Sequence, residues 1–214
     1  MKKLCAVWCV DAVIASILVG GGSTRIGFLD KCLYSLHGRS LAFHIVRVLQ
    51  RTRLFEDIYL FASIRNANAF WEHGVKVLTD VISGGPLAAI HQLIRMFGEV
   101  FVVACDMPYI TVENVSRFVN ACAEGFYACA PRWRSTGYIE PLYAIYRRSL
   151  LGILEKCFAE GELSISRCFS KYGNDKVLHI PVEDLFRDPW KEFRNANSYE
   201  ELVQALEHIR HCII

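Results

Sequence analysis

The chain has 214 residues, of which 53% are hydrophobic and 21% are charged, and this composition excludes a disordered or low-complexity protein. The 24 basic and 22 acidic residues nearly cancel, so no broad nucleic-acid-binding surface is expected. The length predicts a single domain with a core large enough to need no metal or disulfide.

The first 125 residues alternate between apolar, strand-like runs and amphipathic, helix-like segments. Strands are expected at residues 12–19, 58–62, 75–78 and 100–104, and helices at residues 41–49, 87–97 and 111–123. Fully apolar strands that alternate with helices are typical of a parallel sheet covered on both faces. We therefore expect an α/β fold with three layers, α/β/α, and a mostly parallel central sheet.

The second half of the sequence is less regular. Strands are expected at residues 141–146 and 177–180, and helices at residues 150–159 and 164–169. A last helix should begin at Ser198, because Ser198 and Glu201 have the spacing of a capping box. No linker rich in proline or serine divides the chain.

The nine cysteines do not follow any metal-binding pattern, since no C-x-x-C occurs and none lies at zinc spacing from a histidine. Most lie in apolar runs, so we expect free thiols in a reducing cytoplasm. Residues 1–10 are similar to the start of a signal peptide, but Asp11 interrupts the apolar run and no cleavage site follows. We therefore expect a cytoplasmic protein without a membrane anchor.

A glycine-rich loop follows the first predicted strand, where residues 18–31 read LVGGGSTRIGFLDK. Its glycines let the backbone approach a ligand and leave N–H groups free to bind it. Arg25 and Lys31 add two cations suited to phosphates. The loop fits neither the Walker A motif nor the dinucleotide fingerprint. It predicts a nucleoside triphosphate site, and the alternative is a flexible turn with solvated cations.

Asp106 directly follows the predicted strand at residues 100–104, within the sequence CDMP. Ligands of parallel sheets bind at the carboxyl ends of the strands, so Asp106 should face the glycine-rich loop. A single carboxylate can hold Mg²⁺ when substrate phosphates supply further ligands. Asp106 is thus a candidate metal ligand, with a helix-capping role as the alternative.

Residues 18–41 resemble the signature of the molybdenum cofactor guanylyltransferases, a family of the nucleotidyltransferase superfamily. Later segments match the family in order: Asp80 with GPLA at 85–88, CDMP at 105–108, PLYAIY at 141–146 and FRNANS at 193–198. The matches extend over nearly the whole chain. Departures are Ser40, where the family has proline, and an asparagine after the second strand that has no clear counterpart.

The resemblance implies a Rossmann-like nucleotidyltransferase fold and a reaction that transfers GMP from GTP to the phosphate of molybdopterin, releasing pyrophosphate. It implies a nucleotide-binding half, residues 1–125, and an acceptor-binding half, residues 126–214. The implied partners are GTP, molybdopterin, and enzymes that make or receive the cofactor, with no nucleic acid and no membrane.

The resemblance also implies a role for individual residues. The nucleotide-binding set is Leu18, Gly20, Gly21, Gly22, Arg25, Lys31, Asp80, Gly85 and Asp106. Arg25, Lys31 and Asp106 are implied to be catalytic, with Asp106 holding Mg²⁺. Asn195 and Asn197 are implied to bind the acceptor, and turn or cap chemistry before the last helix is the alternative.

Two other functions remain open on the sequence. One is a related nucleotidyltransferase with another acceptor, such as a molybdopterin cytidylyltransferase, a cobinamide-phosphate guanylyltransferase or a sugar-phosphate nucleotidyltransferase. The other is a non-catalytic GTP-binding protein that delivers the cofactor. Compared with the superfamily's signature, which has Ala-Gly in other members, the Gly-Gly step after Val19 favours guanine. The combination of Arg25, Lys31 and Asp106 favours catalysis.

Overall fold

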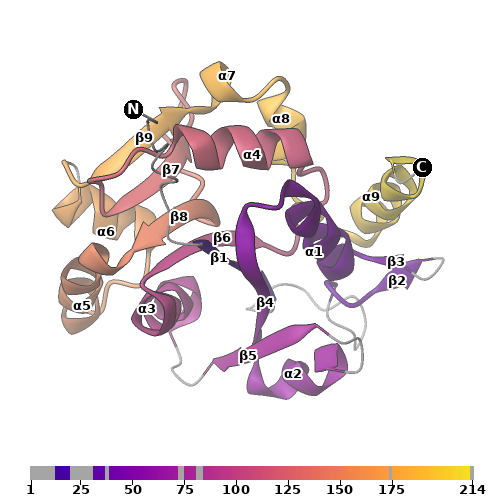
Figure 1. Cartoon of the computed structure of the whole chain (residues 1–214), viewed down its shortest axis with the longest axis horizontal. Helices are drawn as coiled ribbons and strands as arrows, with labels where there is room; N and C mark the ends of the chain where they lie inside the picture. Colours follow the sequence, from indigo (N-terminus) through magenta and orange to yellow (C-terminus); the bar gives the residue numbers. More distant parts are fainter. Residues whose placement is uncertain are drawn as a thin grey trace, which may run out of the picture.

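A computed structural model describes residues 13–19, 31–36, 39–71, 75–80, 84–173 and 175–212. In this part of the chain, seven strands form one sheet in the order β5-β4-β1-β6-β8-β7-β9 (Figure 1). They are β1 (Val13–Val19), β4 (Phe55–Ser63), β5 (Lys76–Asp80), β6 (Glu99–Ala104), β7 (Ala128–Arg132), β8 (Tyr143–Arg147) and β9 (Val177–Pro181). All neighbours pair in parallel except β8, which is antiparallel to β6 and β7. The expected mostly parallel sheet is confirmed.

Helices cover both faces of the sheet. One core cluster contains buried residues of α1 (Leu41–Thr52), α2 (Ile64–Trp71), α4 (Val112–Ala121) and α7 (Val182–Leu185). The other contains residues of α3 (Gly85–Phe97), α5 (Leu151–Ala159) and α6 (Ile165–Tyr172). The remaining elements are the hairpin β2 (Ser35–Leu36) and β3 (Arg39–Ser40), the 3₁₀ turn η1 (Arg148–Leu150), α8 (Pro189–Glu192) and α9 (Tyr199–Cys212). The three-layer arrangement is therefore also confirmed.

The central strands show why the apolar runs fold as they do. In β6, Phe101 and Val103 enter one core cluster, while Val100 and Val102 enter the other. Side chains of a strand alternate between the two faces, so a strand buried on both faces must be apolar throughout. Residues 100–104 meet this condition, and the structure buries all five.

Strand β7 and helix α2 are elements that sequence patterns did not indicate. Strand β7 contains Pro131, a residue that breaks sheet pairing because it has no N–H. Pairing of β7 with β8 stops at Cys129, and beyond it β7 pairs with β9. The proline is therefore tolerated on the side where β8 no longer pairs.

Six cysteines form three disulfides, so the expectation of free thiols is wrong for them. The pairs are Cys32–Cys105, Cys122–Cys129 and Cys157–Cys168, with Cα–Cα distances of 5.9, 5.8 and 5.9 Å. These distances are typical of disulfides. The partners lie on neighbouring elements of the fold, and spacing along the chain gave no indication of this.

Replacing Cys157 with alanine is expected to lower the free energy of unfolding by about 3 kcal/mol, because its disulfide closes a short loop in the unfolded chain. Urea denaturation without reductant measures the change. Ser170→Ala on the surface of α6 serves as control and should change stability by less than about 0.5 kcal/mol. Equal urea midpoints for Cys157→Ala and the wild type would contradict the prediction.

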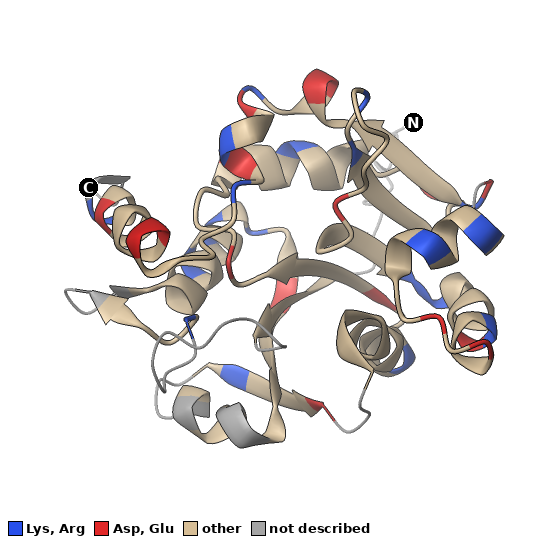
Figure 2. Cartoon of the chain, turned by 180° about the vertical axis from the view of Figure 1, so that it is seen from behind, with Lys and Arg blue, Asp and Glu red and all other residues tan. Residues whose placement is uncertain are grey.

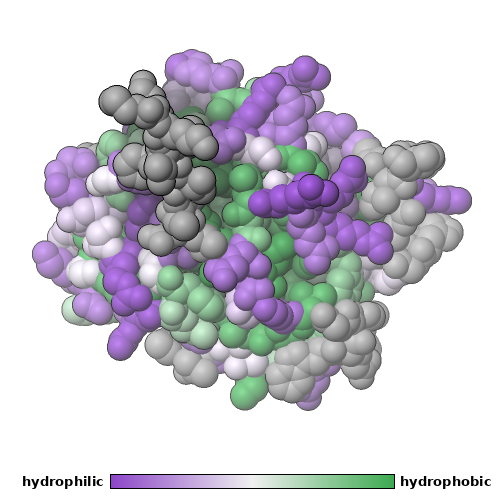
Figure 3. Space-filling model, in the orientation of Figure 1, coloured by the Kyte–Doolittle hydropathy of each residue, from purple (hydrophilic) through white to green (hydrophobic). Residues whose placement is uncertain are grey.

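The surface carries charges of both signs. Figure 2 shows lysine and arginine interspersed with aspartate and glutamate, mainly on helices and connections. Figure 3 shows hydrophilic residues over much of the opposite face, with apolar residues visible between them. Within the described ranges, every helix is too short or too polar to cross a membrane.

Candidate functional site

Four parallel strands have their carboxyl ends along the same side of the sheet, called here the sheet edge. Strands β1, β4, β5 and β6 end there at Val19, Ser63, Asp80 and Ala104. The chain moves from β1 to β4 and β5 on one side and then returns to β6 on the other side. Such a reversal marks the crevice in which α/β sheets bind ligands. The candidate site should therefore lie where β1 and β6 end.

The predicted glycine-rich loop lies directly after β1. Gly20, Gly21, Gly22 and Arg25 lie outside the residues that the structure describes. Leu18 is described: its side chain is buried in the core, and its carbonyl accepts a hydrogen bond from the Cys105 backbone N–H at 3.1 Å. This bond joins the end of β1 to the residue before Asp106.

Lys31 and Asp106 form an ion pair across this crevice. The Lys31 Nζ lies 2.8 Å from Asp106 Oδ2, although 75 residues separate the two in the chain. The Lys31 side chain is only 3% exposed, whereas that of Asp106 is 20% exposed. Cys32 follows Lys31 in the chain and Cys105 precedes Asp106, and a disulfide between these two cysteines joins the same two segments. Lys31, the last residue of the glycine-rich segment, therefore lies directly beside Asp106.

A third segment, residues 193–198, completes the cluster. Besides Asp106, Lys31 donates to the Ala196 carbonyl at 3.2 Å and to Asn197 Oδ1 at 3.4 Å. The Ala196 backbone N–H in turn donates to the Asp106 carbonyl at 2.9 Å. Asn197, expected on the acceptor side, thus contacts the lysine expected on the nucleotide side. The two halves of the sequence meet at Lys31.

The N-terminus of α9 fixes this third segment. Glu201 Oε2 accepts hydrogen bonds from the backbone N–H groups of Asn197 and Ser198, and the Glu201 N–H donates to Ser198 Oγ. The predicted capping box is confirmed. These backbone bonds are the main cause of the lowered pKa of Glu201, and the nearby cations Arg194 and Lys31 add to it.

Asn195 presents a buried acceptor. Within the described part of the chain, its Oδ1 is buried and has no hydrogen-bond partner. A buried polar atom without a partner is costly, and such atoms are often satisfied by a ligand or an ion. This observation supports a binding role for Asn195 over a purely structural turn.

Asp80 lies at the carboxyl end of a strand farther from Asp106, and Gly85 follows it at the start of α3. Asp80 ends the edge strand β5, three strand positions from β6. Gly85 begins α3 with a φ of 66°, a backbone conformation that favours glycine. The structure therefore places Asp80 at the end of β5, three strands away from β6, which leads to Asp106.

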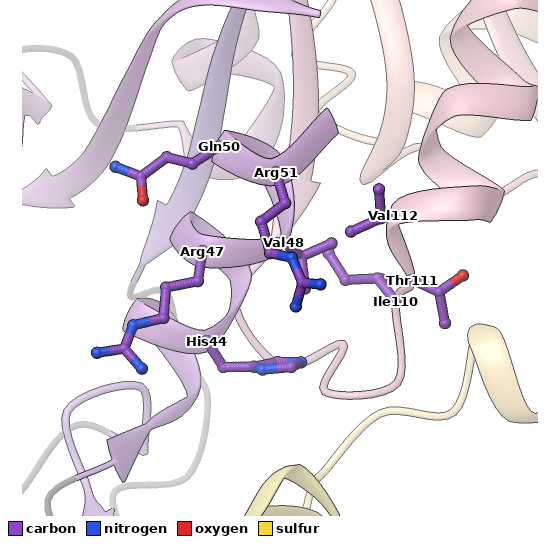
Figure 4. A pocket seen from close by; sticks show the side chains of 8 residues that line it. All are labelled: His44, Arg47, Val48, Gln50, Arg51, Ile110, Thr111 and Val112. Atoms are coloured by element: carbon purple, nitrogen blue, oxygen red, sulfur yellow. The ribbon is translucent and has the colours of Figure 1, made fainter. Parts of the chain in front are cut away.

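A separate pocket opens between α1 and the start of α4 (Figure 4). It has a volume of about 270 Å³ and is lined by His44, Arg47, Val48, Gln50, Arg51, Ile110, Thr111 and Val112. Neither Lys31 nor Asp106 lines it. This pocket is therefore distinct from the cluster at the sheet edge.

Comparison with known proteins identifies the family. A family model described as a MobA-like NTP transferase domain matches residues 15–177. The chain belongs to this family. It is similar to a probable molybdenum cofactor guanylyltransferase of Pyrococcus furiosus, with 36% identity over 92% of the chain and 98% of the relative. A relative of the same name from Thermococcus gammatolerans is 32% identical over 89% and 97%.

Solved structures agree with this assignment. The crystal structure of molybdopterin-guanine dinucleotide biosynthesis protein A from Archaeoglobus fulgidus matches with a TM-score of 0.72 and 26% identity, covering 93% of this chain and all of that one. A 4-diphosphocytidyl-2C-methyl-D-erythritol synthase from Anaerococcus prevotii, 13% identical with a TM-score of 0.67, shares the fold. The chain is thus a nucleotidyltransferase, and Lys31, Asp106 and residues 195–197 are its candidate active site.

Two features of this site, a backbone contact and a disulfide, could not be predicted from the sequence. The Ala196 carbonyl is a backbone group, and its contact with Lys31 does not depend on the type of side chain. The disulfide beside the ion pair joins cysteines 73 residues apart. Glu201 could be found, because its spacing from Ser198 is that of a capping box.

Proposed function

We propose that the protein transfers GMP from GTP to the phosphate of molybdopterin and releases pyrophosphate. The observation that carries this proposal is the contact of Lys31 with both Asp106 and Asn197. It joins the proposed nucleotide-binding half, residues 1–125, to the acceptor-binding half, residues 126–214. The names of the relatives support the choice of guanine nucleotide and of molybdenum cofactor.

In this reaction an oxygen of the acceptor phosphate attacks the α-phosphorus of GTP, and the bond to the bridging oxygen of the β-phosphate breaks. Both reactants are anionic, so the protein's main tasks are to orient them and to stabilise charge. Lys31 and Arg25 would hold the triphosphate and stabilise the negative charge on departing pyrophosphate. No side chain has to act as a nucleophile.

Lys31 must exchange a partner to do this. An ammonium group has three N–H donors, and Lys31 uses them on Asp106, the Ala196 carbonyl and Asn197. The contact with Asn197 is the longest of the three, at 3.4 Å. We expect a phosphate oxygen of GTP to replace it. Asn197 would then be free to bind the acceptor once the nucleotide is in place.

The residues around Asp106 suit Mg²⁺. Carboxylate and amide oxygens are preferred ligands of Mg²⁺. The partly exposed Asp106 carboxylate would supply one, and Asn195 Oδ1, which has no partner among the described residues, would be a candidate for another. Among the described residues, no group of three acidic, histidine or cysteine side chains could hold a metal alone. Substrate phosphates would therefore provide the further ligands. Bound Mg²⁺ would neutralise phosphate charge during transfer.

A nucleotide panel tests the choice of substrate. GTP with Mg²⁺ is expected to raise the melting temperature more than CTP, UTP or ATP at equal concentration, since a ligand specific for the folded state stabilises it by mass action. Release of pyrophosphate from GTP should then depend on added molybdopterin. A larger shift with CTP would indicate a cytidylyltransferase, and GTP binding without pyrophosphate release would indicate a non-catalytic protein.

A further inference from the structure

Glu192, the last residue of α8, is a buried carboxylate outside the proposed active site. It is 2% exposed. Its Oε2 accepts a hydrogen bond from Asn114 Nδ2 at 2.7 Å, and its Oε1 accepts from the Thr111 backbone N–H at 3.3 Å and from the Tyr143 hydroxyl at 3.4 Å. Its three partners lie at the start of α4 and on β8. A buried carboxylate is retained in a core only when its oxygens are satisfied in this way.

One of these contacts, from the Thr111 N–H, joins two chain connections that lie beside the candidate active site. Residues 106–111 connect β6 to α4, and residues 192–196 lead from α8 to the segment with Asn197. The two connections are joined at one end by the Ala196 N–H and the Asp106 carbonyl. At the other end they are joined by the Thr111 N–H and the Glu192 carboxylate. Glu192 therefore provides a second hydrogen-bonded link between residues 106–111, which begin with Asp106, and residues 192–196, which lead to Asn197.

The surroundings of Glu192 are closely packed. Phe193 is buried and packs edge-on against Tyr143 and Phe186, with ring centroids 5.2 and 4.9 Å apart. Burial raises the pKa of Glu192 to about 7, although its hydrogen bonds to Asn114, Thr111 and Tyr143 oppose the change. Because the apolar surroundings offer the Glu192 carboxylate few other hydrogen-bond donors, its bonds to Thr111 and Asn114 determine its position.

We propose that Glu192 is a positioning residue for the acceptor: it holds residues 193–197 in register with Asp106, and thereby places Asn197 beside Lys31 and fixes the neighbouring Asn195. The role in acceptor binding rests on the proposed function. The link between residues 106–111 and residues 192–196 does not rest on the proposed function, and it can be tested without substrate.

Glu192→Leu removes both acceptor oxygens at similar volume, and Glu192→Gln keeps one of them. Hydrogen exchange of the Ala196 amide is expected to accelerate about tenfold in Glu192→Leu, less in Glu192→Gln, and to stay unchanged for the Glu201 amide in α9. With substrates, the KM for molybdopterin should rise about tenfold in Glu192→Leu, because displaced contacts weaken positioning. The dissociation constant for GTP should stay within about twofold.

Tyr143→Phe is the matched control. It removes one donor to the same carboxylate but leaves the link to Thr111 intact. It should lower thermal stability without changing Ala196 exchange or the KM for molybdopterin. If Tyr143→Phe and Glu192→Leu change these quantities equally, Glu192 has only a structural role and the inference is wrong. Should Glu192→Leu fail to fold, Glu192→Gln with unchanged exchange and KM would overturn it equally.

The two proposals fail in different ways. If the wild type forms no dinucleotide from GTP and molybdopterin, the proposed function is wrong, and Ala196 exchange still decides whether Glu192 links the two connections. If the wild type is active and both Glu192 variants match it in KM and exchange, the inference alone is wrong.

Discussion

Replacing Lys31 with alanine is expected to lower the rate of guanylyl transfer about a hundredfold, the effect typical of losing one preorganised contact to developing charge. The structure explains why this lysine should matter so much. Its ammonium is buried and held by three acceptors from two other segments, so it needs little reorganisation when phosphate charge develops. Steady-state pyrophosphate release with saturating GTP and molybdopterin measures the loss.

The fold of Lys31→Ala should survive, because the Asp106 carboxylate left behind is partly exposed to water. Lys76→Ala is the matched control: Lys76 is an exposed lysine on the same sheet, and its ion pair with Asp57 lies away from the proposed site. Its activity should equal that of the wild type. Wild-type turnover in a folded Lys31→Ala protein would remove Lys31 from the proposed mechanism.

The sequence predicted the fold where local patterns and burial agree. Residues 100–104 are apolar on both faces and form the central strand β6. Thr111, Ser164 and Ser198 precede helices, and each accepts a hydrogen bond from the first turn of its helix. These signals are local, so they can be read without knowing which segments are neighbours in the fold.

Features that depend on distant neighbours were missed. Strand β7 contains proline, and its place in the sheet depends on pairing with β9 about 50 residues later. The cysteine partners are likewise set by the fold, since Cys32 and Cys105 are 73 residues apart in the chain.

The candidate site shows the same division. The expectation that Asp106 faces the glycine-rich loop followed from the rule that ligands bind at the carboxyl ends of parallel strands. Of that loop the structure describes Lys31, and it lies beside Asp106. That Lys31 itself is the direct partner of Asp106, and that the Ala196 carbonyl binds the same ammonium, required the coordinates. If Asp106 binds Mg²⁺ as proposed, it must do so while one of its oxygens pairs with Lys31.

Asp106→Asn is expected to lower transfer at least about a hundredfold and to abolish the Mg²⁺ dependence of GTP binding. The substitution preserves shape and leaves the backbone bond from Ala196 to the carbonyl of residue 106 intact, so it isolates the negative charge. Without that charge, Mg²⁺ loses its anionic protein ligand, and the buried Lys31 ammonium loses its counter-ion. The second loss predicts a measurable decrease in thermal stability.

A Mg²⁺ titration of the GTP-induced shift in melting temperature separates these effects. In the wild type the shift should increase with Mg²⁺ and saturate, whereas in Asp106→Asn it should stay small and flat. Asp188→Asn is the control, because Asp188 caps α8 through the Lys191 N–H and has no contact with Lys31. If Asp106→Asn gives the same titration as the wild type, the Asp106 carboxylate pairs with Lys31 but does not bind Mg²⁺. The metal, if bound, would then need ligands from elsewhere in the site.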